Sequence, residues 1–332
     1  MSETVIQPAS LDVQGQAPGL AVSLSRVGVT GVEKIIRIGR GSDEKLLSAH
    51  LECVVDLGPD QKGAHMSRFE EVINDAIGEV ALSGAAFRAE DLAAAIAGLV
   101  RERQGARRAE VTVHARYPEH KPAPVSGIPT QEIYSLHGAA VASAAGTRRL
   151  VGVTAQGITA CPCAQQLVAE RASERLEADG FTPGEIERVL ELVPVATHNQ
   201  RGLGTLYVGC TERCEQPIDA ERMLAIVEEA MSSEVYELMK RSDEVEVVEK
   251  AHRRPRFVED CVREMVRGAV EAYGHLDDET FLLARQENLE TIHQHDVVAE
   301  RFGLLGEIKR ELESGEPSAG HVTRRAWLDG DV

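Results

Sequence analysis

In the first hundred residues the hydrophobic pattern changes from the alternation typical of strands to the spacing typical of helices. Apolar and polar residues alternate in pieces over 21–40 and again over 46–57, which predicts two antiparallel strands. An apolar stripe over 69–77 then predicts a helix, because its members recur at helical spacing, and a second helix is expected over 89–103. The residues before position 20 show little periodicity and are expected to be loose.

Three further strands are expected before position 160. Alternation marks residues 110–117, and it returns over 133–144 and 150–159. The stretch 118–129 contains four prolines and is the clearest internal loop. The first part of the chain therefore predicts two strands, two helices and two strands, and the strand that follows leads into a cysteine motif.

The second half is richer in helical patterns. Residues 165–179 are predicted to form a helix capped by Gly180, and Thr182-Pro183-Gly184-Glu185 is a typical helix start. The remaining elements are a strand over 204–210, helices over 219–238 and 257–273, a partly alternating stretch over 281–295, and a stretch over 302–312 that the pattern leaves as either strand or helix.

The order of these elements predicts an α+β architecture. Two strands, two helices and two strands occur twice, which favours antiparallel sheets with helices packed on one face. No sequence repeat accompanies this duplication, so it depends on element order alone. We expect a flexible N-terminus over 1–20, a first module over 21–150, a second module over 151–313 and a C-terminal tail over 314–332.

Composition narrows the class of protein. The 332-residue chain carries 54 acidic against 36 basic side chains, and the net charge of −18 disfavours binding to nucleic acid phosphates. So acidic a chain, with only 4% aromatic residues, is typical of a salt-loving host. The chain contains no run of about 18 apolar residues that could span a membrane, and its N-terminus lacks the features of a signal peptide. We therefore expect a cytoplasmic protein. In the reducing cytoplasm, six cysteines indicate free thiols or metal ligands rather than disulfides.

The candidate chemistry is concentrated around Cys161-Pro162-Cys163 and the polar segment Thr197-His198-Asn199-Gln200-Arg201. Two thiols separated by one proline make a poor disulfide, because so small a loop is strained. A thiolate held beside a metal or an electrophilic carbon fits better, although a lone cysteine is more often inert core. Cys163 could contact a metal, donate a proton or only pack. Cys210 and Cys214 have no second pair nearby in sequence, and we interpret them as incidental thiols.

Further candidate ligands lie downstream at Glu244, Glu290 and His293. Cysteine, histidine and glutamate together suit zinc or ferrous iron better than calcium or magnesium. Glu290 and His293 share a face of a helical turn, whereas in an extended strand they need a bulge or turn to converge. On composition alone, Glu244 lies in a charged run typical of solvated surface, and Glu259 fits a dipole partner at a helix N-terminus.

Six segments, taken together, resemble a known family. They are Lys62-Gly63-Ala64-His65-Met66-Ser67-Arg68-Phe69, Thr159-Ala160-Cys161-Pro162-Cys163, His198-Asn199-Gln200-Arg201, Lys240-Arg241-Ser242-Asp243-Glu244, Phe257-Val258-Glu259-Asp260 and Asn288-Leu289-Glu290-Thr291-Ile292-His293-Gln294-His295. In this order they resemble the signature segments of type IB GTP cyclohydrolases. The resemblance implies tandem tunnelling-fold (T-fold) modules, a homo-oligomer (dimer or tetramer), a divalent metal, and hydrolytic opening of the guanine imidazole ring of GTP with release of formate.

The resemblance also implies residue roles. The implied metal ligands are Cys161, His198, Glu244, Glu290 and His293, and the implied catalytic side chains are Cys161, Cys163, His198 and His65. Glu259 would bind the guanine edge, because guanine N1–H and its amino group are parallel donors that suit a carboxylate. Lys62, His65 and Arg68 would supply positive charge to the triphosphate, and Arg201 is a further implied substrate-binding residue.

The wording of the cysteine motif and the insertion over 167–197 resemble the archaeal branch of this family. That branch implies Fe(II) and a 7,8-dihydroneopterin 2',3'-cyclic phosphate product for methanopterin biosynthesis, while Zn(II) and Mn(II) are also chemically possible. Three alternatives stay open. They are a cyclohydrolase that gives 7,8-dihydroneopterin triphosphate for folate or deazaguanine pathways, a metal-free thiol reductase of pterin-like or deazaguanine nitriles, and a non-catalytic thiol or metal-binding sensor.

Overall fold

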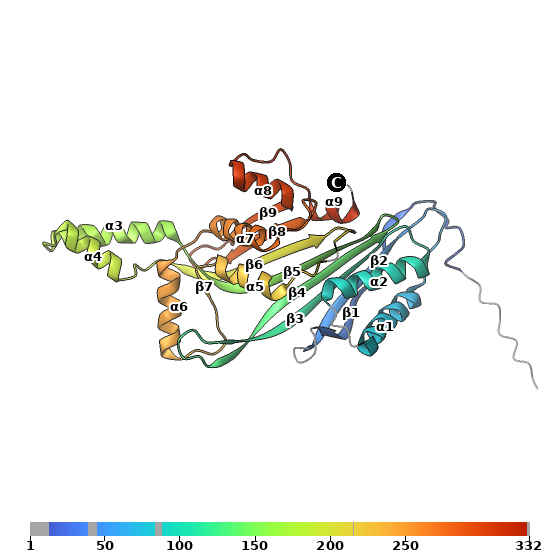
Figure 1. Ribbon diagram of the computed structural model, residues 1–332, viewed down its shortest axis with the longest axis horizontal. Helices are drawn as coiled ribbons and strands as arrows, with labels where there is room; N and C mark the ends of the chain where they lie inside the picture. The colour runs from blue at the N-terminus through green and yellow to red at the C-terminus, as the bar shows by residue number, and fades with distance from the viewer. Residues whose placement is uncertain (1–12, 39–44, 84–87, 215, 331–332) are drawn as a thin grey trace, which may run out of the picture. The chain divides into compact units, whose positions relative to one another are not determined.

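The computed structural model describes residues 13–38, 45–83, 88–214 and 216–330, which form two compact units (Figure 1). The first unit comprises residues up to 113 together with 139–147, and the second comprises 114–138 and 148–332. Strands β3 (Ala109–Pro122) and β4 (Pro129–Ser143) contribute residues to both units. The predicted strands therefore exist, and the proline-rich connection between them shortens to 123–128.

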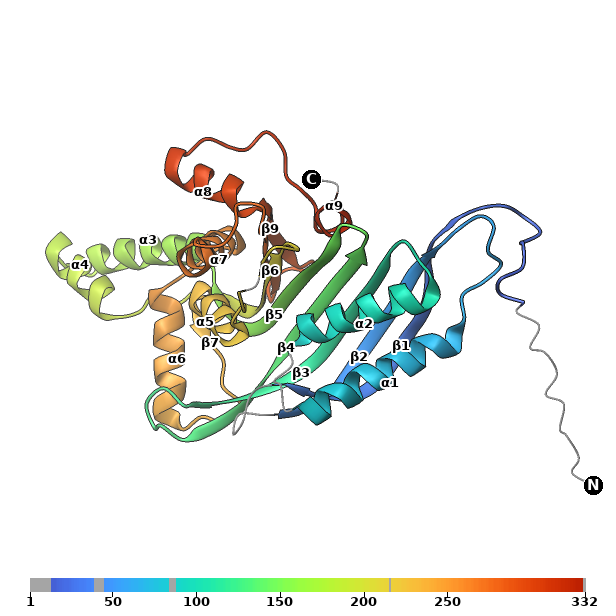
Figure 2. The same cartoon turned by 45° about the vertical axis from the view of Figure 1, so that its right-hand side comes forward.

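The first unit is a strand hairpin covered by two helices. Strands β1 (Leu24–Ile38) and β2 (Lys45–Leu57) pair antiparallel, with Val32 opposite Leu51. Helices α1 (Met66–Ser83) and α2 (Ala89–Gln104) pack on each other and on this hairpin (Figure 2). The fully buried side chains of this core include Ile36, Leu51, Phe69, Ile73, Leu92 and Ile96. The predicted order of two strands and two helices is confirmed.

The second unit contains an antiparallel sheet. Its long strands are β5 (Gly146–Ala160), β6 (Asn199–Cys210), β8 (Phe281–Leu289) and β9 (Val297–Leu304), hydrogen-bonded in that order. The two-residue strand β7 (Ser233–Glu234) pairs with the end of β5. Strand β5 is therefore hydrogen-bonded to both β6 and β7 immediately before the cysteine motif.

Helices α5 (Ala220–Ala230) and α7 (Val258–Tyr273) pack on one face of this sheet. The approach is close at Gly204, where an added Cβ would lie 2.5 Å from Cγ1 of Val227. Because side chains alternate between the two faces of a strand, Leu206 and Val208 are buried on the helix side. The intervening Thr205 and Tyr207 are only partly buried. The predicted architecture, with antiparallel strands and helices on one face, is confirmed.

A helical hairpin is inserted between β5 and β6. Helix α3 (Pro162–Ala178) contains no buried residue, and α4 (Pro183–Leu192) buries only Ile186. Thr182 and Glu185 form the predicted capping box at the start of α4. Figures 1 and 2 show both helices extending away from the strands of the second unit.

The expected helix over 219–238 is wrong in its second half. Helix α5 ends at Ala230, and Ser233 and Glu234 form the short strand β7, which pairs with β5. Pairing with an available strand edge supplies the hydrogen bonds that another helical turn would have provided, so tertiary contacts override the helical pattern. A second helix, α6 (Arg241–Arg253), occupies the charged run that we interpreted only as solvated surface.

The last elements also differ from the sequence pattern. Alternation over 281–295 ends with β8 at Leu289, and the remaining residues bend. The stretch that was left open at 302–312 divides between the end of β9 and helix α8 (Leu305–Ser314).

The expectation of a loose C-terminal tail is wrong for helix α9 (Arg324–Asp329). Trp327 is completely buried, and its indole N–H donates to the carbonyl oxygen of Glu279 at 2.8 Å. Arg148 also donates to the carbonyl of Trp327 and lies over its ring, so both side chains hold this short helix against the protein. The loose N-terminus was expected over 1–20, and its first twelve residues lie outside the described residues. None of the helices in the described ranges is long and apolar enough to cross a membrane.

Candidate functional site

Cys161 lies where β5 passes into α3. It is the N-cap of that helix, and its Sγ accepts a hydrogen bond from the backbone N–H of Ala164 at 3.5 Å. Pro162 follows at the first helical position, where its missing N–H costs nothing. The backbone N–H of Cys161 donates to the carbonyl of His198 at 3.1 Å. This arrangement holds the sulfur at the positive end of a helix dipole, a favourable place for an anionic group.

His198 is held by a buried glutamine. Its Nδ1 lies 3.2 Å from Oε1 of Gln200, whose Nε2 donates to Oγ1 of Thr159 at 3.1 Å. Gln200 is only 5% exposed and Thr159 is completely buried, so the amide has a fixed orientation. Because its oxygen faces His198, the imidazole carries its proton on Nδ1 and leaves Nε2 available as a ligand or base.

Glu290 and His293 follow the end of β8, where the chain bends. The backbone N–H of Glu290 donates to Oδ1 of Asp296, and the Thr291 hydroxyl donates to the carbonyl of Asn199, each at 3.1 Å. The rings of His293 and His295 stack with centroids 5.1 Å apart. This bend is the turn that Glu290 and His293 needed in order to converge.

Glu290 is an unusual carboxylate. Its side chain is only 7% exposed, and its Oε2 lies 3.7 Å from Nδ1 of His198. Among the described residues this oxygen is buried and has no hydrogen-bond partner. A buried carboxylate oxygen without a donor is costly, which indicates that another group, such as a cation, completes its surroundings.

These side chains open into one cavity of about 270 Å³. Five of the residues predicted from sequence line it, namely Cys161, His198, Glu259, Glu290 and His293. They come from four different segments, separated by up to 132 positions from Cys161 to His293 (293 − 161). The antiparallel pairing of β5 with β6 and of β6 with β8 brings those segments to the same end of the sheet.

Glu259 enters the cavity from the first turn of α7. The capping contact at this helix start is made by Asp260, whose Oδ2 accepts from the backbone N–H of Phe257 at 3.0 Å. The segment before the helix is tied to β5 by a hydrogen bond from the backbone N–H of Arg256 to Ala160 at 2.9 Å. Because Asp260 caps the helix, Glu259 is left facing the cavity.

Three sequence candidates of the second unit do not line this cavity. Glu244 is exposed on α6, and Cys163 is exposed in the first turn of α3. Arg201 lines another cavity, of about 460 Å³, together with Gln156 and Tyr236. The separation of Arg201 from Gln200 follows from strand geometry, because successive side chains point to opposite faces of a sheet.

The remaining candidates, Lys62, His65 and Arg68, belong to the first unit. The backbone N–H and carbonyl of His65 both bond to the side-chain amide of Gln104, at 3.2 and 2.9 Å. Nη1 of Arg68 donates to the carbonyl of Arg103 at 3.0 Å. These contacts fix the start of α1 against the end of α2.

Comparison with known proteins identifies the family of this chain. The family model described as type I GTP cyclohydrolase FolE2 matches residues 11–299. The chain belongs to this family. Among its relatives, GTP cyclohydrolase MptA of Methanococcus vannielii is 40% identical over 309 residues, which cover 91% of this chain and 98% of the relative. MptA of Methanocaldococcus jannaschii is also 40% identical, over 92% of this chain and 98% of its own.

The fold has a distant counterpart among solved structures. Uricase from Arthrobacter globiformis aligns with a TM-score of 0.51 over 91% of this chain and 97% of its own, at 7% sequence identity. So low an identity shows a common fold and nothing about chemistry. The likeness agrees with the predicted tunnelling-fold architecture of this FolE2 family member.

Sequence reasoning missed several residues that line the cavity. Gln200, Arg256 and Asn288 are among them, and His295 was named only as part of the last signature segment. Gln200 could have been found, because it lies within the polar segment that contains His198. Asn288 gave a weaker signal, since a polar residue in a strand is ordinarily exposed, yet this one is only 2% exposed. Cys210 and Cys214 lie outside the cavity, with their Sγ atoms 2.8 Å apart.

The donor set of this FolE2 cavity fits a borderline divalent cation. A thiol, imidazoles and a carboxylate are ligands that zinc and ferrous iron accept. Oε2 of Glu290, which has no hydrogen-bond partner among the described residues, could act as one of these ligand atoms. Within the described ranges, no three His, Cys, Asp or Glu side chains already stand in a ligating arrangement. Binding a cation would therefore require side-chain rotations within the cavity.

Proposed function

We propose that this protein is a GTP cyclohydrolase that opens the imidazole ring of GTP by hydrolysis, releases formate, and serves pterin biosynthesis of the methanopterin type. The observation that carries the proposal is the 40% identity to GTP cyclohydrolase MptA over 91% of this chain and 98% of the relative. The cavity lined by Cys161, His198, Glu259 and Glu290 supports it, because these side chains can bind a purine and a cation together.

We further propose the type IB, Fe(II)-dependent form of the reaction, with Zn(II) or Mn(II) as substitutes. Cys161, His198, Glu290 and His293 would hold the cation, and Glu244 is a further candidate that lies outside the cavity. A cation bound there supplies Lewis acidity and makes hydroxide available near neutral pH. Gln200 engages Nδ1 of His198, which leaves Nε2 as the ring nitrogen available for this role.

Substrate binding falls to the chain's polar side chains. The carboxylate of Glu259 would accept hydrogen bonds from guanine N1–H and the exocyclic amine, which orients C8 toward Cys161 and His198. Lys62, His65, Arg68 and Arg201 are proposed to bind the triphosphate, which needs local positive charge in a chain of net charge −18. As the ring opens, the leaving nitrogens need protons, and Cys163 and His65 are candidate donors.

The proposed product is 7,8-dihydroneopterin 2',3'-cyclic phosphate. Its second ring forms after formate is lost, when the freed amine condenses with the carbonyl group of the opened and rearranged sugar and water leaves. Formation of the cyclic ester requires the 2'-hydroxyl of the opened sugar chain to attack the α-phosphorus. The new P–O bond replaces the bond to the β-phosphate, the hydroxyl proton goes to solvent, and diphosphate leaves. The alternative product keeps all three phosphates, so release of diphosphate distinguishes the two outcomes.

The test is an anaerobic incubation of the protein with Fe(II) and GTP. We expect one formate and one diphosphate per GTP, and a product that mass spectrometry identifies as the cyclic phosphate. Cys161→Ala should lose formate release, whereas Cys210→Ala, a cysteine outside the cavity, should retain it. Formate without diphosphate would indicate the triphosphate product. GTP that stays intact with every metal would leave a non-catalytic binding protein as the better explanation.

Two wider proposals accompany the reaction. The chain is expected to act as a homo-oligomer, either dimer or tetramer, in the cytoplasm of a salt-loving archaeon, as its acidic composition suggests. Light scattering at molar salt concentration measures the assembly, and a mass equal to one 36.0 kDa chain would contradict it.

A further inference from the structure

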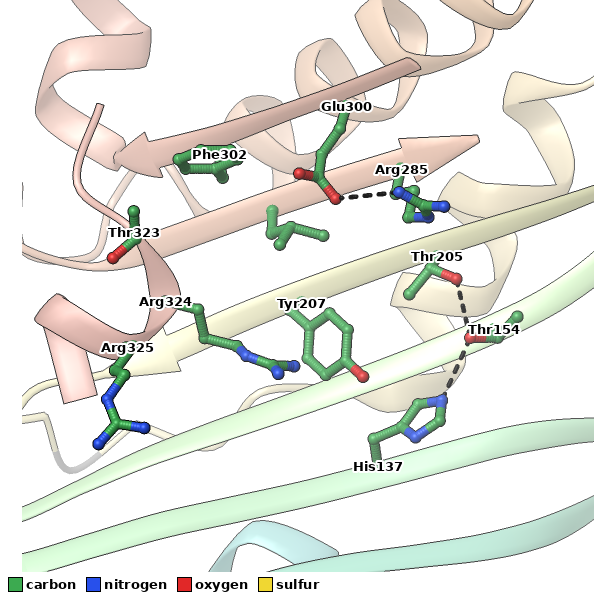
Figure 3. Close-up of a pocket in the computed structure, with 11 residues that line it drawn as sticks. His137, Thr154, Thr205, Tyr207, Arg285, Glu300, Phe302, Thr323, Arg324 and Arg325 are labelled. Atoms are coloured by element: carbon green, nitrogen blue, oxygen red, sulfur yellow. Dashed lines mark hydrogen bonds and ion pairs between the residues drawn. The ribbon is translucent and has the colours of Figure 1, made fainter. Parts of the chain in front are cut away.

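A further and larger cavity lies on the sheet of the second unit. Its volume is about 560 Å³, within the range of small-molecule sites, compared with about 270 Å³ for the cavity at Cys161. Strands β4, β5, β6, β8 and β9 form its floor, and the start of α9 closes one side (Figure 3). It shares none of its lining residues with the cavity at Cys161.

The two cavities lie at different positions along the strands. Thr154 in the larger cavity precedes Cys161 by seven residues on β5, and Thr205 follows His198 by seven residues on β6. On β8 and β9 the lining residues of the two cavities are three residues apart. At a rise of about 3.3 Å per strand residue, the separation is about 20 Å on β5 and β6 and about 10 Å on β8 and β9.

The charge of this cavity opposes that of the whole chain. Its lining includes three arginines, Arg285, Arg324 and Arg325, and one carboxylate, Glu300. Arg285 is paired with Glu287 at 2.9 Å and with Glu300 at 3.5 Å, and Arg325 lies 3.5 Å from Asp329. In a protein of net charge −18, this excess of arginines over carboxylates in one cavity favours an anionic ligand there.

Arg324 differs from its two neighbours. Its guanidinium lies over the ring of Tyr207, 5.5 Å from the centroid, and within the described part of the chain no carboxylate pairs with it. Figure 3 shows this side chain directed into the cavity toward Tyr207, whereas Arg325 points away. Arg324 also hydrogen-bonds the Tyr207 side chain, and because a guanidinium has five N–H donors, these contacts orient the group and leave further N–H groups for an anion.

A row of hydroxyl and imidazole groups lies opposite. Nε2 of His137 is 3.2 Å from Oγ1 of Thr154, which is 2.9 Å from Oγ1 of Thr205 (Figure 3). Nδ1 of His137 is 2.7 Å from Nδ1 of His114, so one of these two rings must donate a proton to the other. Neutral donors and acceptors of this kind suit the hydroxyls and ring nitrogens of a nucleoside better than a second charge.

We propose that this cavity is a second ligand site that binds a phosphate monoester carrying a planar ring, the class to which nucleoside monophosphates belong. Arg324 binds the phosphate, because a guanidinium and a phosphate match in bidentate geometry. Phe302 supplies aromatic surface for the ring, and Thr154 and Thr205 hydrogen-bond the sugar or the ring edge. The site is separate from the proposed reaction and does not depend on it.

Equilibrium dialysis with labelled AMP and GMP tests this site. The protein is the full chain carrying Glu259→Ala, which disables guanine binding in the catalytic cavity. We expect saturable binding of at least one probe, one per chain, and roughly tenfold or greater weakening by Arg324→Ala, since a charge-assisted hydrogen bond is lost. Thr154→Val, which removes a hydroxyl at nearly constant volume, should weaken binding to a lesser degree.

The controls separate a lost ligand contact from a lost fold. Arg188→Ala removes an exposed arginine of α4 and should leave binding unchanged. Trp327 is the single tryptophan of the chain and packs in α9, so unchanged tryptophan emission in Arg324→Ala establishes that the helix still docks. The proposal is overturned if neither probe saturates, if Arg324→Ala binds as well as its parent, or if binding appears only when Glu259 is intact.

Discussion

Oε2 of Glu290 and Nδ1 of His198 stand 3.7 Å apart, a contact too long for a hydrogen bond. The imidazole proton is already directed to Gln200, so this carboxylate oxygen stays bare inside the protein. A cation that enters the cavity would relieve this cost by taking Glu290 as a ligand. The pair thus links the local geometry to the metal proposed for the reaction.

Replacing Glu290 by Gln should lower metal affinity by about tenfold or more, because the ligand charge is lost. Glu244→Gln is the matched comparison, since Glu244 is exposed outside the cavity, and it should change affinity less. Metal content after dialysis against a graded chelator, measured by mass spectrometry of the metal, provides the readout. An equal or greater loss in Glu244→Gln would assign the ligand role to that carboxylate.

Gln200 is expected to act as a positioning residue for His198. Gln200→Leu removes the acceptor at Nδ1 and should weaken metal binding by about tenfold to a hundredfold, as loss of a group behind a metal ligand commonly does. The electronic spectrum of the Co(II)-loaded protein should shift as well, because the ligand ring reorients. Gln166→Leu, at an exposed glutamine of α3, is the control, and an unaltered spectrum in Gln200→Leu contradicts the role.

Glu259→Gln should impair recognition of guanine, because an amide replaces a carboxylate that accepts two parallel hydrogen bonds. KM for GTP is expected to rise by roughly tenfold or more with a smaller change in kcat. The preference for GTP over inosine triphosphate, which lacks the exocyclic amine, should fall as well. Glu271→Gln, at an exposed position of the same helix, should leave both values unchanged. If Glu259→Gln keeps the preference for GTP over inosine triphosphate, this carboxylate does not recognise guanine.

His137 should make stability depend on pH. Burial, followed by the neighbouring His114 and Arg324, lowers the pKa of His137 to about 4. The unfolded chain therefore binds more protons between roughly pH 6.5 and 4, so the free energy of unfolding falls as pH is lowered through that window, by roughly 1–3 kcal/mol. His137→Gln keeps hydrogen bonding without titrating, and urea unfolding of this variant should show a flatter pH profile. A profile as steep as that of the parent would assign the dependence to other groups.

Trp327→Ala should destabilise the second unit by about 3–5 kcal/mol, because it empties a completely buried site and leaves the carbonyl of Glu279 without its donor. Denaturant unfolding followed by circular dichroism measures this loss. Leu312→Ala, at a half-exposed position of α8, is the control and should cost far less. Equal effects would mean that α9 contributes no specific packing.

Much of the fold follows from local pattern. Alternation predicted β1 and β2, helical spacing predicted α1 and α2, and the Thr182–Glu185 pattern predicted the start of α4, because each depends on residues close in sequence. The extension of α5 beyond Ala230 was predicted wrongly, since the strand edge that captures Ser233 belongs to a segment more than seventy positions earlier. Helix α9 was missed for the same reason, because the partner of Trp327 is Glu279.

The sequence by itself determined the chemistry available to this protein, since thiol, imidazole and carboxylate groups in recognisable segments specify a donor set and a family. Only the tertiary structure decided which of them meet. Strand pairing brought Cys161, His198, Glu290 and His293 to one cavity with Glu259, and it left Glu244 and Cys163 exposed outside it. The physical reason is that side-chain direction depends on strand register, on a bend after β8 and on hydrogen bonds such as that of Gln200, all of which arise from contacts between distant segments.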